Sequence, residues 1–303
     1  MRLKSILVFL LCTSFLGAQS FTSKDIAINS LIDGTLLLPA NGSDAPLVII
    51  IAGSGPTDRN GNQNFMQSNA LKKLAEGLTN EGIATFRYDK RIVKQIRKGN
   101  VDPNMMFDDF ITDAKSVLQY FRPTFTKIYI AGHSQGSLVG MLAASEGADG
   151  FISLAGAGKS IDEVITEQVE KTAPMFAEDA KRVFAILKEG KTTDDFPPAL
   201  TSIFYKDVQP FMSSWMQYNP QDSIQSLNIP VLIINGTKDL QVSEDEANLL
   251  NKANTNSKLV LIKNMNHILV PIEGDDLENS KSYNEPHRKI SSELLSAIKA
   301  FVK

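Results

Sequence analysis

The chain has 303 residues, of which 43% are hydrophobic and 21% are charged, and this composition is typical of a globular protein with a sizeable core. Its formal net charge of −3 at pH 7 argues against a nucleic-acid-binding surface, so no partner of that class is expected. The single cysteine, Cys12, excludes an internal disulfide and a cysteine-based metal site.

The first twenty residues, MRLKSILVFLLCTSFLGAQS, have the pattern of a secretory signal. Two basic residues precede an apolar run from Ile6 to Leu16, and small residues lead up to Ala18. The run is too short to cross a bilayer. We expect a signal peptide over 1–18, export to the periplasm or the exterior, and no membrane span in the mature chain. A buried N-terminal helix and a lipid anchor at Cys12 are the alternatives.

The rest of the chain predicts strands and helices in alternation. An early segment places Asp33-Gly34 between two apolar runs, which is typical of a hairpin, so the sheet should begin with antiparallel strands. Six further apolar runs lack polar alternation, as strands covered on both faces do. They are LVIIIA (47–52), IATFRY (83–88), KIYIAG (127–132), FISLAG (151–156), PVLIING (230–236) and KLVLIK (258–263). Helix-like stretches occupy 67–81, 107–121, 136–147, 243–253 and 287–302. This order predicts an α/β fold with a doubly wound, mostly parallel sheet.

The strand pattern stops between residues 157 and 228. Helical charge patterns and five prolines take its place. We expect a helical cap inserted late in the sheet, with the core formed by 19–156 and 229–303. The large apolar side chains of this segment could form an acyl pocket or simply pack the cap on the core; they are Phe176, Phe184, Phe204, Phe211, Trp215 and Met216.

The strand at 127–132 runs into Gly132-His133-Ser134-Gln135-Gly136, and a helix-like run follows. A G-x-S-x-G sequence between a strand and a helix is the pattern of a nucleophile elbow, in which the serine takes a strained backbone conformation. The turn would lift the Ser134 hydroxyl off the carboxyl edge of the sheet, at a helix N-terminus that favours negative charge. Ser134 is therefore the predicted nucleophile, and a plain strand-to-helix turn is the alternative.

A serine hydroxyl needs a base that accepts its proton, and the chain has three histidines. His133 lies within the elbow, where its side chain should point away from that of the serine. His287 begins the last predicted helix, which is typical of a solvated residue. His267 follows the last predicted strand, at the sheet edge where the serine is expected, so we predict that His267 is the base.

The base needs an acid that fixes its tautomer. Asp239 follows a predicted strand and therefore also lies at the carboxyl edge of the sheet. The order Ser134, Asp239, His267 is the order of α/β-hydrolase triads. Glu244 and Asp245 are weaker candidates because they fall in the first turn of the next helix, and a simple turn aspartate is the alternative for Asp239.

The oxyanion of such a reaction needs two N–H donors. One should be the backbone amide of Gln135, which follows the nucleophile. The other should come from the loop Gly53-Ser54-Gly55-Pro56 after the strand at 47–52, and we predict the amide of Ser54. A simple glycine turn is the alternative, whereas a phosphate loop is excluded because no G-K-[ST] sequence follows.

Five segments carry a resemblance to a known family: GSGPTDRNGN, FRYDKR (86–91), GHSQG, GTKD and NHIL. Together they resemble the α/β-hydrolase superfamily over nearly the whole mature chain, in a bacterial esterase and thioesterase-like branch near the serine aminopeptidase group. The resemblance implies serine-dependent hydrolysis of acyl esters with no cofactor and no metal.

The chain departs from that family pattern after FRYDKR, where relatives have a glycine-rich turn and this sequence reads IVKQIRKGN, so the loop near the cleft should be reshaped. Within the motif, Arg87 and Asp89 are expected to pair structurally. Haloalkane dehalogenases and epoxide hydrolases of this fold carry aspartate at the nucleophile position, and Ser134 excludes both.

The combined prediction is an exported serine hydrolase that takes a small or medium carboxylic ester through an acyl-enzyme. A peptidase or amidase, an acyltransferase or a carbohydrate deacetylase would use the same triad. A non-catalytic binding module on the same scaffold is the alternative from a different class. The pattern leaves acyl chain length, oligomeric state and physiological substrate open.

Overall fold

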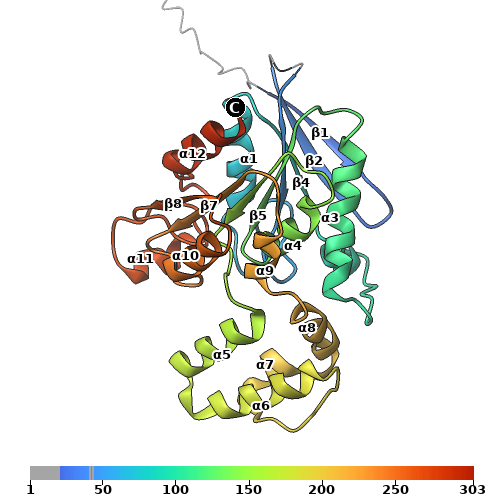
Figure 1. Cartoon of the computed structure of the whole chain (residues 1–303), viewed down its shortest axis with the longest axis vertical. Helices are drawn as coiled ribbons and strands as arrows, with labels where there is room; N and C mark the ends of the chain where they lie inside the picture. Colours follow the sequence, from blue (N-terminus) through green and yellow to red (C-terminus); the bar gives the residue numbers. More distant parts are fainter. Residues whose placement is uncertain (1–20, 41, 43) are drawn as a thin grey trace, which may run out of the picture.

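The computed structural model describes residues 21–40, 42 and 44–303, so the signal peptide expected over 1–18 lies outside the described residues. Within that part of the chain, eight strands form one sheet in the order β1-β2-β4-β3-β5-β6-β7-β8 (Figure 1). Their bounds are β1 Phe21–Ala27, β2 Asp33–Pro39, β3 Leu47–Ile51, β4 Ala84–Tyr88, β5 Ile128–His133, β6 Gly150–Leu154, β7 Val231–Gly236 and β8 Lys258–Ile262. All neighbours from β4 to β8 pair in parallel, and β2 is antiparallel to β1 and β4. The predicted mostly parallel sheet is confirmed.

Helices cover both faces of the sheet because its central strands are apolar on both sides. Their bounds are α1 Ala70–Asn80, α2 Arg91–Arg97, α3 Phe107–Phe121, α4 Gln135–Ala144, α10 Glu244–Ala253, α11 Asp276–Ser282 and α12 Ser292–Val302. On β3, Ile49 and Ile51 belong to the core cluster that includes residues of α3, α4 and α10. The alternate residues Val48 and Ile50 belong to the cluster with α1 and α12. The sheet is thus doubly wound.

The first hairpin turns at a different place from the one predicted. β1 and β2 pair until Ala27 faces Asp33, so Asp33-Gly34 begins β2 and is not the turn. The turn precedes it, where the Asn29 side chain accepts hydrogen bonds from the N–H groups of Leu31 (2.8 Å) and Ile32 (3.0 Å). An asparagine that bonds the backbone two residues on makes a turn without an Asp-Gly pair.

The reshaped loop expected after FRYDKR is largely helical, because α2 begins at Arg91 and ends at Arg97. One other boundary differs from the prediction. The last helix begins at Ser292 and not at 287, because the Ser291 side chain accepts the N–H of Leu294 (3.3 Å) and caps it. His287 is exposed ahead of this helix.

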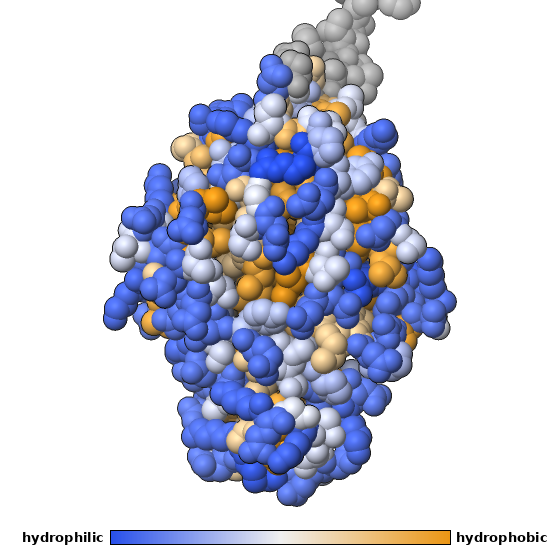
Figure 2. Space-filling view, turned by 45° about the vertical axis from the view of Figure 1, so that its right-hand side comes forward, coloured by the Kyte–Doolittle hydropathy of each residue, from blue (hydrophilic) through white to orange (hydrophobic). Residues whose placement is uncertain are grey.

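The chain between β6 and β7 is helical, and it contains no strand within the described residues. Its helices are α5 Ile161–Thr172, α6 Ala177–Lys188, α7 Thr201–Phe204, α8 Gln209–Trp215 and α9 Pro220–Gln225, with 3₁₀ turns at Pro174–Phe176, Pro198–Leu200 and Lys206–Val208. Helices α5 to α8 form a lobe at the bottom of Figure 1 with a core cluster of its own, whereas Ile224 of α9 joins the core under the sheet. The outer surface of this lobe is mostly hydrophilic (Figure 2). No helix among residues 21–40, 42 and 44–303 is long and apolar enough to cross a membrane.

Candidate active site

The chain turns sharply from β5 into α4 at Ser134. Its φ of 54° and ψ of −123° are strained for a residue with a side chain. A side-chain carbon on Gly132 would lie 2.1 Å from the carbonyl oxygen of Gly136, and one on Gly136 would lie 2.5 Å from that of Ile51. Both glycines are needed for strand and helix to approach this closely. The turn leaves Ser134 partly exposed at the N-terminus of α4.

Asp239 and His267 meet beside this turn. His267 Nδ1 lies 2.8 Å from Asp239 Oδ2, and both side chains are buried. The other carboxylate oxygen, Oδ1, accepts the backbone N–H groups of Gln241 (2.8 Å) and Val242 (2.9 Å). Three donors thus fix the carboxylate, and the hydrogen on His267 Nδ1 leaves Nε2 of the same ring as a proton acceptor.

The loop that carries His267 is anchored by the residue before it. The amide of Asn266 is buried and donates to Asn279 Oδ1 (2.8 Å) and Ser282 Oγ (2.9 Å) in α11. Its side-chain oxygen accepts the N–H of Val270 (3.2 Å). This network fixes the position of the His267 backbone, and Asn266 was not among the predicted site residues although it begins the NHIL segment.

His133 supports the same loop from the other side. Its Nε2 lies 2.8 Å from the carbonyl oxygen of His267, so Nε2 carries the hydrogen and donates it. Burial, together with the nearby His267, lowers the pKa of His133 to about 4, so the ring is neutral at pH 7. The Nε2–H group of His133 is therefore used in a hydrogen bond to the backbone of His267.

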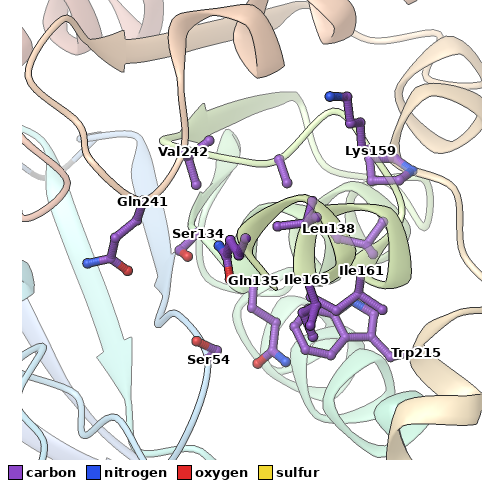
Figure 3. Close-up of a pocket in the computed structure, with 14 residues that line it drawn as sticks. Ser54, Ser134, Gln135, Leu138, Lys159, Ile161, Ile165, Trp215, Gln241 and Val242 are labelled. Atoms are coloured by element: carbon purple, nitrogen blue, oxygen red, sulfur yellow. The ribbon is translucent and has the colours of Figure 1, made fainter. Parts of the chain in front are cut away.

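The two amides predicted for the oxyanion hole flank Ser134. The carbonyl of Ser54 accepts hydrogen bonds from Thr57 Oγ1 (2.7 Å) and Gln63 Nε2 (3.0 Å), which hold the loop after β3. Neither the N–H of Ser54 nor that of Gln135 donates to another described residue. Both residues line a cavity with Ser134, and Figure 3 shows Ser54 and Ser134 on the same side of it.

Lys90, within the FRYDKR segment, is a buried lysine next to this site and was not among the predicted site residues. Its ammonium donates to the carbonyl of Gly53, lies 3.4 Å from Gln135 Oε1 and stands 5.1 Å from the ring centre of Phe110. Burial lowers the pKa of Lys90 to about 7. A lysine two residues after the buried parallel strand β4 was the signal that could have indicated it, because such a strand ends at the sheet edge that holds the site.

Three cavities meet at Ser54. One of about 290 Å³ is lined by both Ser134 and His267, and so brings the predicted nucleophile and base to a common space. A second of about 300 Å³ runs past Ser134 toward α5. A third, of about 570 Å³, extends under α8.

Two of the six large apolar residues of 157–228 line cavities, and both also pack against the core under the sheet. Trp215 lines both the second and the third cavity, and Phe211 lines the third. Figure 3 shows Trp215 across the cavity from Ser134. The remaining four pack within the lobe: Phe176, Phe184, Phe204 and Met216.

The expected pair between Arg87 and Asp89 does not form. Asp89 instead binds Arg59 (3.0 Å) and Arg97 (2.6 Å), whereas Arg87 donates to Asn60 Oδ1 (3.3 Å). The sequence could not show this, because Arg59 reaches Asp89 from the loop after β3. Among the described residues, no group of three or more His, Cys, Asp or Glu is placed to hold a metal ion.

Comparisons with known proteins agree with this architecture. No protein-family model matches the chain. Esterase EstD of Thermotoga maritima is 26% identical over 273 residues, which cover 86% of this chain and 63% of the relative. The chain thus spans less than two thirds of that relative's length.

Solved structures of other proteins have the same fold. Est1E from Butyrivibrio proteoclasticus superposes with a TM-score of 0.56 at 20% identity, over 92% of this chain and 96% of that one. The Pyrococcus furiosus esterase Pf2001 gives a TM-score of 0.54 at 16% identity, over 94% and 93%. The strand order and the two helical layers, together with these neighbours, show that the chain has an α/β-hydrolase fold.

Proposed function

We propose that the protein is a serine hydrolase of carboxylic esters that works through an acyl-enzyme. The observation that carries the proposal is the His267–Asp239 hydrogen bond, on a cavity that His267 shares with the strained Ser134. Activated serines in hydrolases are recognised by this arrangement of nucleophile, base and orienting acid. The name of the relative EstD supports an ester as the bond that is cleaved.

In the proposed reaction, the Ser134 oxygen attacks the acyl carbonyl while its proton moves to His267 Nε2. The carbonyl oxygen becomes negative and is bound by the N–H groups of Ser54 and Gln135. Asp239 continues to accept the hydrogen bond from His267 Nδ1 and stabilises the imidazolium. When the tetrahedral intermediate collapses, the alcohol leaves with the proton from Nε2.

Deacylation repeats these steps with water. Water attacks the acyl carbon as its proton passes to His267, the bond to Ser134 breaks, and the serine oxygen recovers the proton. We propose that the helices within 157–228 act as a cap. The apolar surface of Phe211 and Trp215 then suits an apolar acyl or alcohol group of small to medium size.

The proposal is tested with p-nitrophenyl esters from acetate to laurate. We expect the wild type to hydrolyse them, and Ser134→Ala to lose several orders of magnitude in turnover. Ser145→Ala, which removes an exposed hydroxyl at the end of the same helix, is the matched control and should stay active. Equal activity of the wild type and Ser134→Ala, or a preference for amides over esters, would contradict the proposal.

We also propose that the protein is exported, with cleavage after Ala18. The basic residues, the apolar run and the small residues at 17 and 18 support it. N-terminal sequencing of the protein expressed in a bacterium should find Gln19 as the first residue in the periplasmic or secreted fraction. Full-length protein confined to the cytoplasm would contradict it.

A further inference from the structure

Lys90 lies between the two segments that carry the predicted oxyanion donors. β4, which leads to Lys90, is the neighbour of β3, and β3 is the neighbour of β5. The Lys90 side chain reaches across the end of β3, where it donates to the Gly53 carbonyl and approaches the Gln135 side chain (3.4 Å). One ammonium therefore contacts both the loop after β3 and the elbow after β5.

The contact with Gly53 determines the direction of the amide at Ser54. The Gly53 carbonyl and the Ser54 N–H belong to one peptide unit, and in a planar trans peptide the two point in opposite directions. Because Lys90 holds the carbonyl oxygen, the N–H of the same peptide points away from Lys90, and Ser54 itself lines the cavity that it shares with Ser134. A peptide flipped at this point would present its oxygen to the substrate and remove a donor.

Lys90 forms no ion pair with any residue that the structure describes. The neighbouring carboxylates have other partners, since Asp89 binds Arg59 and Asp113 binds Arg91. The polar contacts of Lys90 within the described residues are the Gly53 carbonyl and the Gln135 amide oxygen. A donor that is hydrogen-bonded to a carbonyl polarises the peptide and strengthens the N–H at its other end as a donor, and the Lys90 amine can donate in its charged and in its neutral form.

We propose that Lys90 is a positioning residue that holds the oxyanion hole open by fixing the Gly53–Ser54 peptide and the Gln135 segment. The inference rests on the proposed ester hydrolysis for its kinetic consequence. A residue that only stabilised the fold would change the amount of active protein, and not the rate of each active site.

The test substitutes Lys90→Met, which keeps an unbranched side chain against Phe110 and removes the donor. Lys94→Met is the matched control, because Lys94 lies one turn further along α2 and pairs with Asp33 (2.7 Å). Active sites are counted by complete labelling with a phosphonate ester, and kcat and KM are measured for p-nitrophenyl acetate. Crystal structures of the wild type and of Lys90→Met give the orientation of the Gly53–Ser54 peptide.

We expect kcat per active site to fall about 10²-fold in Lys90→Met with little change in KM, because loss of one oxyanion donor typically has this effect. The Gly53–Ser54 peptide should be rotated in the variant, and Lys94→Met should match the wild type. Where Lys90→Met gives no folded protein, Lys90→Leu removes the same donor and takes its place.

Unchanged kcat, or a peptide oriented as in the wild type, would overturn the role of Lys90. The orientation of the Gly53–Ser54 peptide in the two crystal structures tests the role of Lys90 whether or not the wild type hydrolyses esters. Absence of ester hydrolysis by the wild type would count against the proposed function instead, so the two failures are distinguishable.

Discussion

Asp239→Asn is the substitution whose effect the structure defines most closely. Asp239 Oδ1 accepts the N–H groups of Gln241 and Val242, and Oδ2 faces His267 Nδ1 at 2.8 Å. An asparagine at this position must keep its oxygen toward the two backbone donors, because its NH₂ group would oppose them. The NH₂ group then points at His267 Nδ1 and donates to it.

This reversal changes the tautomer of His267. A ring that accepts at Nδ1 carries its hydrogen on Nε2, and so has no lone pair there for the proton of Ser134. The negative charge that stabilises the imidazolium is lost as well. We expect kcat to fall about 10⁴-fold, which corresponds to about 5.5 kcal/mol of transition-state stabilisation.

The assay is hydrolysis of p-nitrophenyl acetate at pH 7, with the folded fraction checked by thermal unfolding. Asp245→Asn is the matched control, because this exposed carboxylate lies at the start of the next helix and should be dispensable. A loss smaller than about tenfold in Asp239→Asn would refute the assignment of Asp239 as the residue that fixes the tautomer of His267.

Three further outcomes follow from the geometry. Gly136→Ala forces a methyl group within 2.5 Å of the Ile51 carbonyl and should lower the free energy of unfolding by about 1–3 kcal/mol in urea titrations; unchanged stability would mean that α4 is free to shift away from β3. Because the pKa of His133 is about 4 when folded and about 6.5 when unfolded, the unfolded chain binds more protons between these values, so stability is lost as pH falls from 6.5 toward 4. Each pH unit of that interval changes the free energy of unfolding by about 1.36 kcal/mol. The free energy of unfolding of the wild type should therefore fall by up to about 3 kcal/mol more than that of His133→Gln, and parallel plots of unfolding free energy against pH for the two proteins would contradict this. Trp215→Ala should lower the ratio of kcat/KM for laurate to that for acetate by about 10- to 100-fold, and an unchanged ratio would show that the acyl chain does not contact Trp215.

The elbow could be predicted from sequence because its requirements are local. Glycines two residues on either side of Ser134 reflect backbone contacts, and the strand and helix patterns adjoin them directly. Asp239 and His267 could be placed because each follows a parallel strand, β7 and β8, and parallel strands have their carboxyl ends at the same edge of the sheet. Their hydrogen bond agrees with that placement.

Contacts that depend on strand order could not be predicted in this way. Lys90 reaches Gly53 only because β4 lies beside β3, and Arg59 reaches Asp89 for the same reason. The sequence does not show which parallel strands are neighbours. The position of the first hairpin turn was predicted wrongly for a different reason. The prediction placed the turn at the Asp-Gly pair, whereas the hydrogen bonds accepted by the Asn29 side chain form it earlier in the chain.

Covalent labelling of Ser134 tests the central claim most directly. The wild type and Ser134→Ala are treated with a p-nitrophenyl phosphonate, which an activated serine attacks at phosphorus with release of p-nitrophenolate. Mass spectrometry of the intact proteins and of their peptides locates the adduct. The proposed mechanism predicts one adduct per wild-type chain, on the peptide that contains Ser134, and none on Ser134→Ala. An unlabelled wild type, or equal labelling of the two proteins at another residue, would contradict Ser134 as the nucleophile.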